Sequence, residues 1–321
     1  MSAPARCLGI QASLKGIRRP LVMDHIVLGG ASFRARPTVS CAFLPSSRGA
    51  FSVFGSSSSG DFDSPHVRLD YFPLNQAGQA SGGGCFVWDA CPDTKVFRDG
   101  DQLLLKTFCD GKPNELEWLS RLSGTGEVIQ VYANSTFDGT GNSVFPGLDA
   151  YPHLRFILAW QLAQVQGLWL HASAALHKGK MYLFTGRSGR GKSTLSKLLH
   201  ASGQFEIASD EKNVLRKTPE GFRAFGTPWT SSARLCSNIS APLAGIFFLD
   251  HARENSCLSM TPGAALKKLI PQVHIPWFDE PLTQRIMQTL ETLVGTVPCW
   301  ALGFRPDREV VDRLVEFVDG R

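Results

Sequence analysis

Apolar and polar side chains alternate in short runs along the first 150 residues of the chain. The clearest runs are residues 67–72, 85–88 and 127–132. Because a period of two places the apolar side chains on one face of an extended chain, each run predicts a half-buried β-strand. The turn Arg98-Asp99-Gly100-Asp101 joins two further runs between Val96 and Phe108, which predicts a β-hairpin. Residues 1–150 are therefore expected to form a small, mostly β N-terminal domain, a candidate recognition module.

From residue 151 the pattern changes to a mixture of helices and strands. A stripe of apolar residues at helical spacing predicts a helix over 151–165, and Gly167 lies beyond its end. Strands are expected at 168–176, 181–184, 205–208, 213–217, 245–249 and 297–304, and helices at 193–201, 282–293 and 308–318. This mixture predicts an α/β domain over residues 151–321.

A glycine-rich segment between a predicted strand and a predicted helix carries the most specific chemistry. From Gly186 to Ser193 it satisfies the phosphate-loop pattern G-x-x-x-x-G-K-[ST] at every fixed position. Backbone N–H groups of such a loop cradle phosphate oxygens, and the following helix N-terminus adds partial positive charge. We therefore expect ATP to be bound by Gly186, Arg187, Ser188, Gly189, Arg190, Gly191, Lys192, Ser193 and Thr194.

Within this loop, Lys192 would reach the β- and γ-phosphates, and the Ser193 hydroxyl would hold Mg²⁺. Arg187 and Arg190 are unusual at their positions. They would either clamp phosphate oxygens in bidentate fashion or point into solvent.

Nucleotide enzymes also need an acid near Mg²⁺ and usually a base for the attacking hydroxyl. Two acids stand at the ends of predicted strands: Asp210, with Glu211 beside it, and Asp250. The more apolar strand precedes Asp250, so the residue pattern alone leaves both acids open. His171 lies in a strand of small and apolar residues just before the phosphate loop, as either a hydrogen-bonded core residue or a catalytic group.

Composition narrows the range of partners. The net charge of +5 comes without a run of basic residues, so no nucleic-acid partner is expected. Eight cysteines are scattered without a C-x-x-C pair, which does not indicate a zinc site. The sequence shows no signal segment and no apolar stretch long enough to cross a bilayer, so we expect a cytoplasmic protein with no membrane partner.

His171 in a Leu-His-Ala strand, the loop 186–194 and Ser209-Asp210-Glu211 together resemble the catalytic domain of the HPr kinase/phosphorylase family. The resemblance covers about residues 165–215 and implies a P-loop domain related to the ATP-dependent phosphoenolpyruvate carboxykinases. It implies that Asp210 is the base for a substrate serine and that His171 hydrogen-bonds and orients Asp210. It also implies that Glu211 holds Mg²⁺ alongside Ser193, and that the protein forms a homo-oligomer. With the family in view, Asp210 is favoured over Asp250.

The sequence departs from this family at two places. Glu211 stands where the family typically has Asp, and Ala224-Phe225-Gly226-Thr227-Pro228-Trp229 stands where a glycine- and arginine-rich segment is usual. That loop would either shape a different acceptor pocket or form an ordinary turn with a packed tryptophan.

These features favour a Mg²⁺- and ATP-dependent kinase that phosphorylates a hydroxyl, with serine of a protein or peptide as the expected acceptor. A small-molecule kinase and a nucleotide-binding switch without an acceptor are the alternatives. A transporter ATPase or a GTPase is disfavoured, because no Leu-Ser-Gly-Gly follows the loop and no Asn-Lys-x-Asp occurs.

Overall fold

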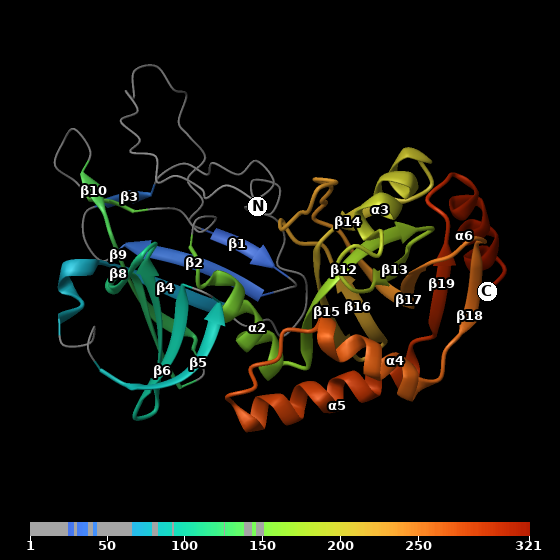
Figure 1. Cartoon of the computed structure of the whole chain (residues 1–321). Helices are drawn as coiled ribbons and strands as arrows, with labels where there is room; N and C mark the ends of the chain where they lie inside the picture. Colours follow the sequence, from blue (N-terminus) through green and yellow to red (C-terminus); the bar gives the residue numbers. More distant parts are fainter. Residues whose placement is uncertain are drawn as a thin grey trace, which may run out of the picture.

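The computed structural model describes residues 25–28, 31–37, 41–43, 66–78, 83–91, 93–124, 126–137, 143–145 and 151–321. They form a mixed α/β fold with two eight-stranded sheets and one three-stranded sheet. The helix α2 (Leu154–Gln164) lies between the two large sheets (Figure 1). The boundary expected at residue 150 falls in 146–150, outside the described residues, so the division into two domains stays a prediction.

The N-terminal large sheet has the strand order β1-β2-β4-β9-β8-β7-β6-β5. Its strands are β1 (His25–Leu28), β2 (Ala31–Pro37), β4 (His66–Pro73), β5 (Cys85–Cys91), β6 (Thr94–Asp99), β7 (Gln102–Cys109), β8 (Lys112–Ser123) and β9 (Val128–Ala133). The runs predicted from alternation fall in β4, β5 and β9, and the predicted hairpin is confirmed as the antiparallel pair β6–β7. A short 3₁₀ helix, η1 (Leu74–Gln76), follows β4, and β3 (Cys41–Phe43), β10 (Thr136–Phe137) and β11 (Ser143–Phe145) form the small sheet.

The C-terminal large sheet has the order β13-β12-β15-β16-β17-β19-β18, with β14 paired to β12 and β13 also paired to β17. Its strands are β12 (Gly167–His177), β13 (Lys180–Thr185), β14 (Glu206–Ser209), β15 (Lys212–Thr218), β16 (Gly221–Phe225), β17 (Ser240–His251), β18 (Ser256–Ser259) and β19 (Cys299–Phe304). The helices that follow α2 in this half of the chain are α3 (Lys192–Ala201), α4 (Pro262–Leu269), η4 (Ile270–Gln272), α5 (Glu280–Thr296) and α6 (Glu309–Asp319).

Alternation along the central strands of this sheet sends side chains into two separate cores. Ile246 and Phe248 of β17 join the core with α2, α4 and α5, whereas Phe247 and Leu249 join the core with α3 and α6. Because successive side chains of a strand point to opposite faces, helices cover both faces of these strands. In Figure 1, α3 lies on one face and α4 and α5 lie on the other.

The helix that joins the two halves starts later than its pattern predicts. The expected start was Tyr151, but α2 begins at Leu154. The side chains of Tyr151 and His153 are buried instead against the N-terminal sheet, where Ser120 Oγ lies 2.5 Å from the Tyr151 hydroxyl and 2.7 Å from His153 Nδ1. Hydrogen bonds to another sheet hold these residues outside the helix, and periodicity carries no sign of such contacts.

One hydrophobic cluster runs through both halves of the chain by way of α2. It contains Leu28 and Phe33 of the N-terminal sheet, Leu158 of α2, and Leu168 and Ile246 of the C-terminal sheet. Apolar burial therefore stabilises the two halves together.

Replacing Leu158 with alanine should destabilise the whole chain. Leu158 is fully buried in this cluster, so Leu158→Ala should lower the free energy of unfolding by about 2–5 kcal/mol. The control is Leu258→Ala, which removes the same atoms from a side chain that is 65% exposed and should change stability by less than about 0.5 kcal/mol. Urea unfolding followed by circular dichroism measures both, and equal losses in the two variants would contradict the shared core.

Candidate phosphate-binding site

Strand register brings the sequence-predicted residues to one edge of the C-terminal sheet. Thr185, the last residue of β13, pairs with Ala172 of β12 on one side and with Phe248 of β17 on the other. Ser209, the last residue of β14, pairs with Ala174 of the same β12. Because β14 and β17 both run parallel to β13, Asp210 and the loop at Gly186 follow strands that end at this edge, and Asp250 lies near the end of β17 at the same edge. Ligands of open α/β sheets bind outside such carboxyl ends.

The predicted loop has the expected strand–loop–helix arrangement. β13 ends at Thr185, the backbone N–H of Arg190 donates to the carbonyl of Arg187, and α3 begins at Lys192 with Gly191 as its N-cap. Gly189 and Gly191 adopt φ angles of 82° and 87°, which glycine reaches without strain. The Lys192 ammonium, largely buried, donates to the carbonyl oxygen of Gly186 at 2.8 Å. The positive charge that would meet a phosphate is thus held against the loop's own backbone.

A buried carboxylate is tied to the start of α3 through one serine. Asp210 is 1% exposed. Its carboxylate accepts hydrogen bonds from the Ser231 N–H at 3.0 Å, from the Ser231 hydroxyl at 2.5 Å and from the Ala233 N–H at 3.0 Å. The same Ser231 hydroxyl lies 2.7 Å from Ser193 Oγ. Ser193, Ser231 and Asp210 therefore form a continuous chain of oxygen atoms at the N-terminus of the helix.

The hydrogen bonds that orient Asp210 differ from those implied by the family resemblance. Within the described part of the chain they come from residues 231–233, and none comes from His171. His171 is half-buried at the same edge, paired with Lys212 across β12 and β15. Burial, with the nearby positive charges of Lys192 and Lys212, lowers the pKa of His171 to about 4. The imidazole is therefore neutral at physiological pH.

Glu211 lies among cations. Burial lowers the pKa of Lys192 and of Lys212, and the negative charge of Glu211 opposes this effect at both lysines. Glu211 therefore partly neutralises the positive field around the loop.

Oxygen donors suit Mg²⁺, which is commonly held by one or two carboxylates together with substrate phosphates and water. The hydroxyl of Ser193 and the carboxylates of Asp210 and Glu211 belong to this class. Among the described residues, no group of three or more His, Cys, Asp or Glu side chains is arranged to hold a metal ion.

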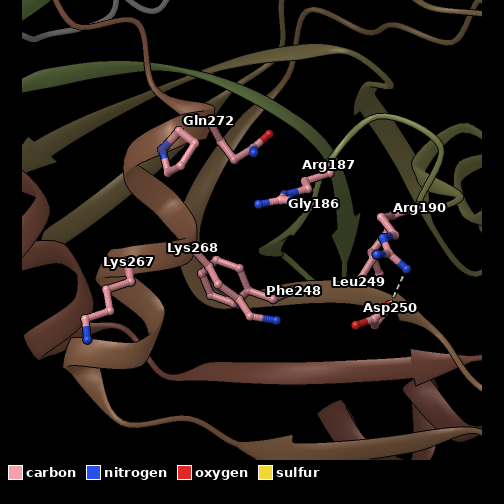
Figure 2. Close-up of a pocket in the computed structure, with 10 residues that line it drawn as sticks. Gly186, Arg187, Arg190, Phe248, Leu249, Asp250, Lys267, Lys268 and Gln272 are labelled. Atoms are coloured by element: carbon pink, nitrogen blue, oxygen red, sulfur yellow. Dashed lines mark hydrogen bonds and ion pairs between the residues drawn. The ribbon is translucent and has the colours of Figure 1, made fainter.

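The second candidate acid has a different environment. Asp250 is 55% exposed and forms an ion pair with Arg190 of the loop at 2.7 Å, drawn as a dashed line in Figure 2. Next to it, His251 Nε2 lies 3.0 Å from the carbonyl oxygen of Gly189. Arg190 is thus engaged by a protein carboxylate, whereas Arg187 is exposed. These contacts fasten the outer side of the loop to the end of β17.

The Gly-Thr-Pro-Trp loop is the element that carries Ser231 into the site. Trp229 is buried, with its ring centroid 5.3 Å from that of Trp169, and its carbonyl oxygen accepts from Ser209 Oγ at 2.7 Å. A Cβ atom on Gly226 would lie 2.5 Å from the Ala208 carbonyl oxygen, so only glycine fits this close approach. The packed tryptophan expected as one alternative is confirmed.

Sequence reasoning missed Ser231 and Ala233. Neither belongs to a recognised motif, and Ser231 follows the predicted strand end by more than twenty positions. The only available signal was the unusual loop at 224–229, which leads directly into them.

Comparisons with known proteins add little to this picture. No protein-family model matches the sequence, and no curated protein is significantly similar to it. The chain resembles, at a distance, the solved structure of the Hpr(Ser) kinase/phosphatase from Coxiella burnetii. The match has 11% sequence identity and a TM-score of 0.30, and it covers 47% of this chain and 95% of that one. A TM-score this low supports no argument about function.

The described part of the chain contains no helix that is both long and apolar enough to cross a membrane.

Alanine at two glycines of the loop should separate backbone strain from crowding. Both positions have positive φ, so either substitution should cost about 1–2 kcal/mol. A Cβ at Gly189 meets nothing within 4 Å, whereas one at Gly191 would lie 2.6 Å from Phe304 Cζ. Gly191→Ala should therefore destabilise the chain by about 1–3 kcal/mol more than Gly189→Ala, measured by urea unfolding. In a double-mutant cycle, Phe304→Leu should recover part of the loss at Gly191 and none of the loss at Gly189.

Acid should destabilise the fold partly through His171. The folded pKa of about 4 lies below the ordinary value of 6.5, so between these pH values the unfolded chain binds a proton that the folded chain does not. This contribution is fully present above pH 6.5 and is lost as the pH falls toward 4. His171→Gln should therefore show a shallower fall in stability over this range, measured as urea midpoints at several pH values. Identical slopes in the two proteins would contradict the assignment.

Proposed function

We propose that this protein is a kinase that uses ATP and Mg²⁺ to phosphorylate a hydroxyl group. The observation that carries the proposal is the oxygen chain Ser193–Ser231–Asp210, which links a phosphate-loop helix to a buried carboxylate at one sheet edge. Phosphoryl transfer needs these two groups together: a loop that holds the donor and a base that faces the acceptor.

In the proposed reaction, the loop amides and Lys192 hold the phosphates, and Lys192 exchanges the Gly186 carbonyl for phosphate oxygens. The acceptor oxygen forms a bond to the γ-phosphorus while the bond between that phosphorus and the bridging oxygen breaks, leaving ADP. Asp210 receives the acceptor's proton. An ionised carboxylate has about four acceptor positions, so three existing hydrogen bonds leave one for the acceptor.

The other residues assist this step. Mg²⁺ would be held by Ser193 and Glu211 together with the nucleotide, and it would offset the charge that develops on the phosphates. Neutral His171 adds no charge of its own beside Lys192. It can donate a hydrogen bond to the acceptor.

A nucleotide switch without an acceptor is the second candidate. It needs the loop and a metal-binding acid but no base. The buried position of Asp210 among three donors resembles a held base more than an open metal ligand, and this geometry favours the kinase.

Asp210→Asn should abolish transfer and spare nucleotide binding. Removal of a general base costs about 10²–10⁴-fold in rate, because the acceptor must then lose its proton without help. Incorporation of label from γ-labelled ATP into a cell lysate and a metabolite extract measures transfer, and calorimetry with Mg²⁺–ADP measures binding. Asp250→Asn is the matched control, since it makes the same change at the competing acid, and it should reduce transfer far less than Asp210→Asn does.

Two further variants separate effects on nucleotide binding from effects on transfer. Ser231→Ala keeps the Asp210 carboxylate while removing one of its donors, so it should reduce transfer less than Asp210→Asn does. Lys192→Ala should lose both binding and transfer. Binding lost together with transfer in a folded Asp210→Asn would contradict the base assignment. Transfer lost in Asp250→Asn alone would move that role to Asp250.

A further inference from the structure

A pocket beside the phosphate loop is lined by several basic side chains. It has a volume of about 310 Å³ and is bounded by Arg187, Arg190, Asp250, Lys267, Lys268 and Gln272, with Gly186 at its inner wall. Lys192, Ser193, Thr194 and Asp210 are not among its lining residues. The pocket is therefore contiguous with the phosphate cradle but distinct from it.

The charges in this pocket are unbalanced. Its one acid, Asp250, is already paired with Arg190. Arg187, Lys267 and Lys268 make no ion pair among the described residues. Lys267 and Lys268 occupy the last turn of α4, where a helix dipole favours cations. That preference explains why the two lysines stand at the end of α4. It does not explain why Arg187, from the glycine-rich loop, lines the same pocket.

A glutamine amide faces the same space. Gln272, at the end of η4, is 8% exposed as a residue, and no side-chain hydrogen bond is found for it in the part of the chain that the structure describes. In Figure 2 it extends from η4 toward the phosphate loop at Arg187. The Gln272 amide is not among the buried polar atoms that lack a partner, so it opens onto the pocket, where it can hydrogen-bond a polar ligand.

From this arrangement we infer that the pocket binds an anionic group, a phosphate or a carboxylate, of a small phosphoacceptor. The inference rests on the proposed kinase function and specifies its acceptor class. Arg187 offers a planar fork of donors for such a group, the two lysines supply charge, and Gln272 adds a neutral donor. A volume of about 310 Å³ lies at the small end of ligand pockets, which suits a small molecule better than a folded protein surface.

Three related compounds test the charge requirement. Glycerol, glycerate and glycerol 3-phosphate share a three-carbon hydroxylated skeleton and carry no anionic group, a carboxylate and a phosphate, respectively. Binding to the full chain is measured by calorimetry at low salt, with and without saturating Mg²⁺–ADP. We expect at least one of the two anions to bind in the presence of ADP and glycerol not to bind, and the stronger anion identifies the preferred group.

Two variants locate the binding. Lys267→Ala/Lys268→Ala and Gln272→Leu should each weaken the anion by about tenfold or more and leave Mg²⁺–ADP affinity unchanged. The matched control is Lys197→Ala/Lys217→Ala, which removes two exposed lysines outside the pocket and should change neither affinity.

Anion binding that is unchanged in both pocket variants would overturn the inference, as would mutual exclusion of anion and ADP, which would mean a single site. If neither anion binds while ADP binds, the inference is overturned and the kinase proposal is left standing. Failure of ADP to bind would instead overturn the kinase proposal. A labelled protein whose transfer is insensitive to the pocket variants would assign the acceptor to another surface.

Discussion

The burial of one carboxylate fixes the arrangement of the whole candidate site. A charged group that is removed from water must be matched by donors, or it destabilises the fold by several kcal/mol. Asp210 meets this requirement only because residues 231–233 fold back over the end of β14. That path in turn depends on Gly226, which passes the Ala208 carbonyl too closely for a side chain, and on Trp229 packed against Trp169. The serine that reaches the start of α3 is therefore positioned by packing well away from the glycine-rich loop.

The described residues of the N-terminal half connect to this site through the shared core. In the described residues its buried polar groups, such as Ser120 and Thr107, are engaged with Tyr151 and His153 at the start of α2. The fully buried His153 has its pKa lowered to about 3 by burial, so it bridges these hydroxyls as a neutral ring. Because α2 then packs on β12, the strand that carries His171, the N-terminal sheet supports the back of the site.

Much of the local structure was readable from the sequence, because local rules determine it. Strand alternation and helical stripes predicted β4, β9, α5 and α6, and the fixed glycines and lysine predicted the strand–loop–helix at Gly186. The predicted start of α2 was wrong, because the Tyr151 hydroxyl is hydrogen-bonded to Ser120 in the N-terminal sheet. The short helix α4 was missed, although Thr261 and Pro262 mark its start, because eight residues are fewer than the window over which helical periodicity is recognised. The donors to Asp210 and the pocket with Gln272 depend on contacts between segments far apart in sequence, which no local pattern encodes.

The hydrogen bond between Lys192 and the Gly186 carbonyl holds a largely buried ammonium in one position. A lysine that stayed buried without an acceptor would strain the fold, and one that swung into solvent would lose its position. Here the backbone oxygen gives the ammonium an acceptor, so the lysine keeps its place. Any anion bound by Lys192 would have to replace that carbonyl and would lose one hydrogen bond to a charged donor, about 1.5–3 kcal/mol. Under the proposed function, the loop would therefore favour a ligand with several negative charges over a neutral one.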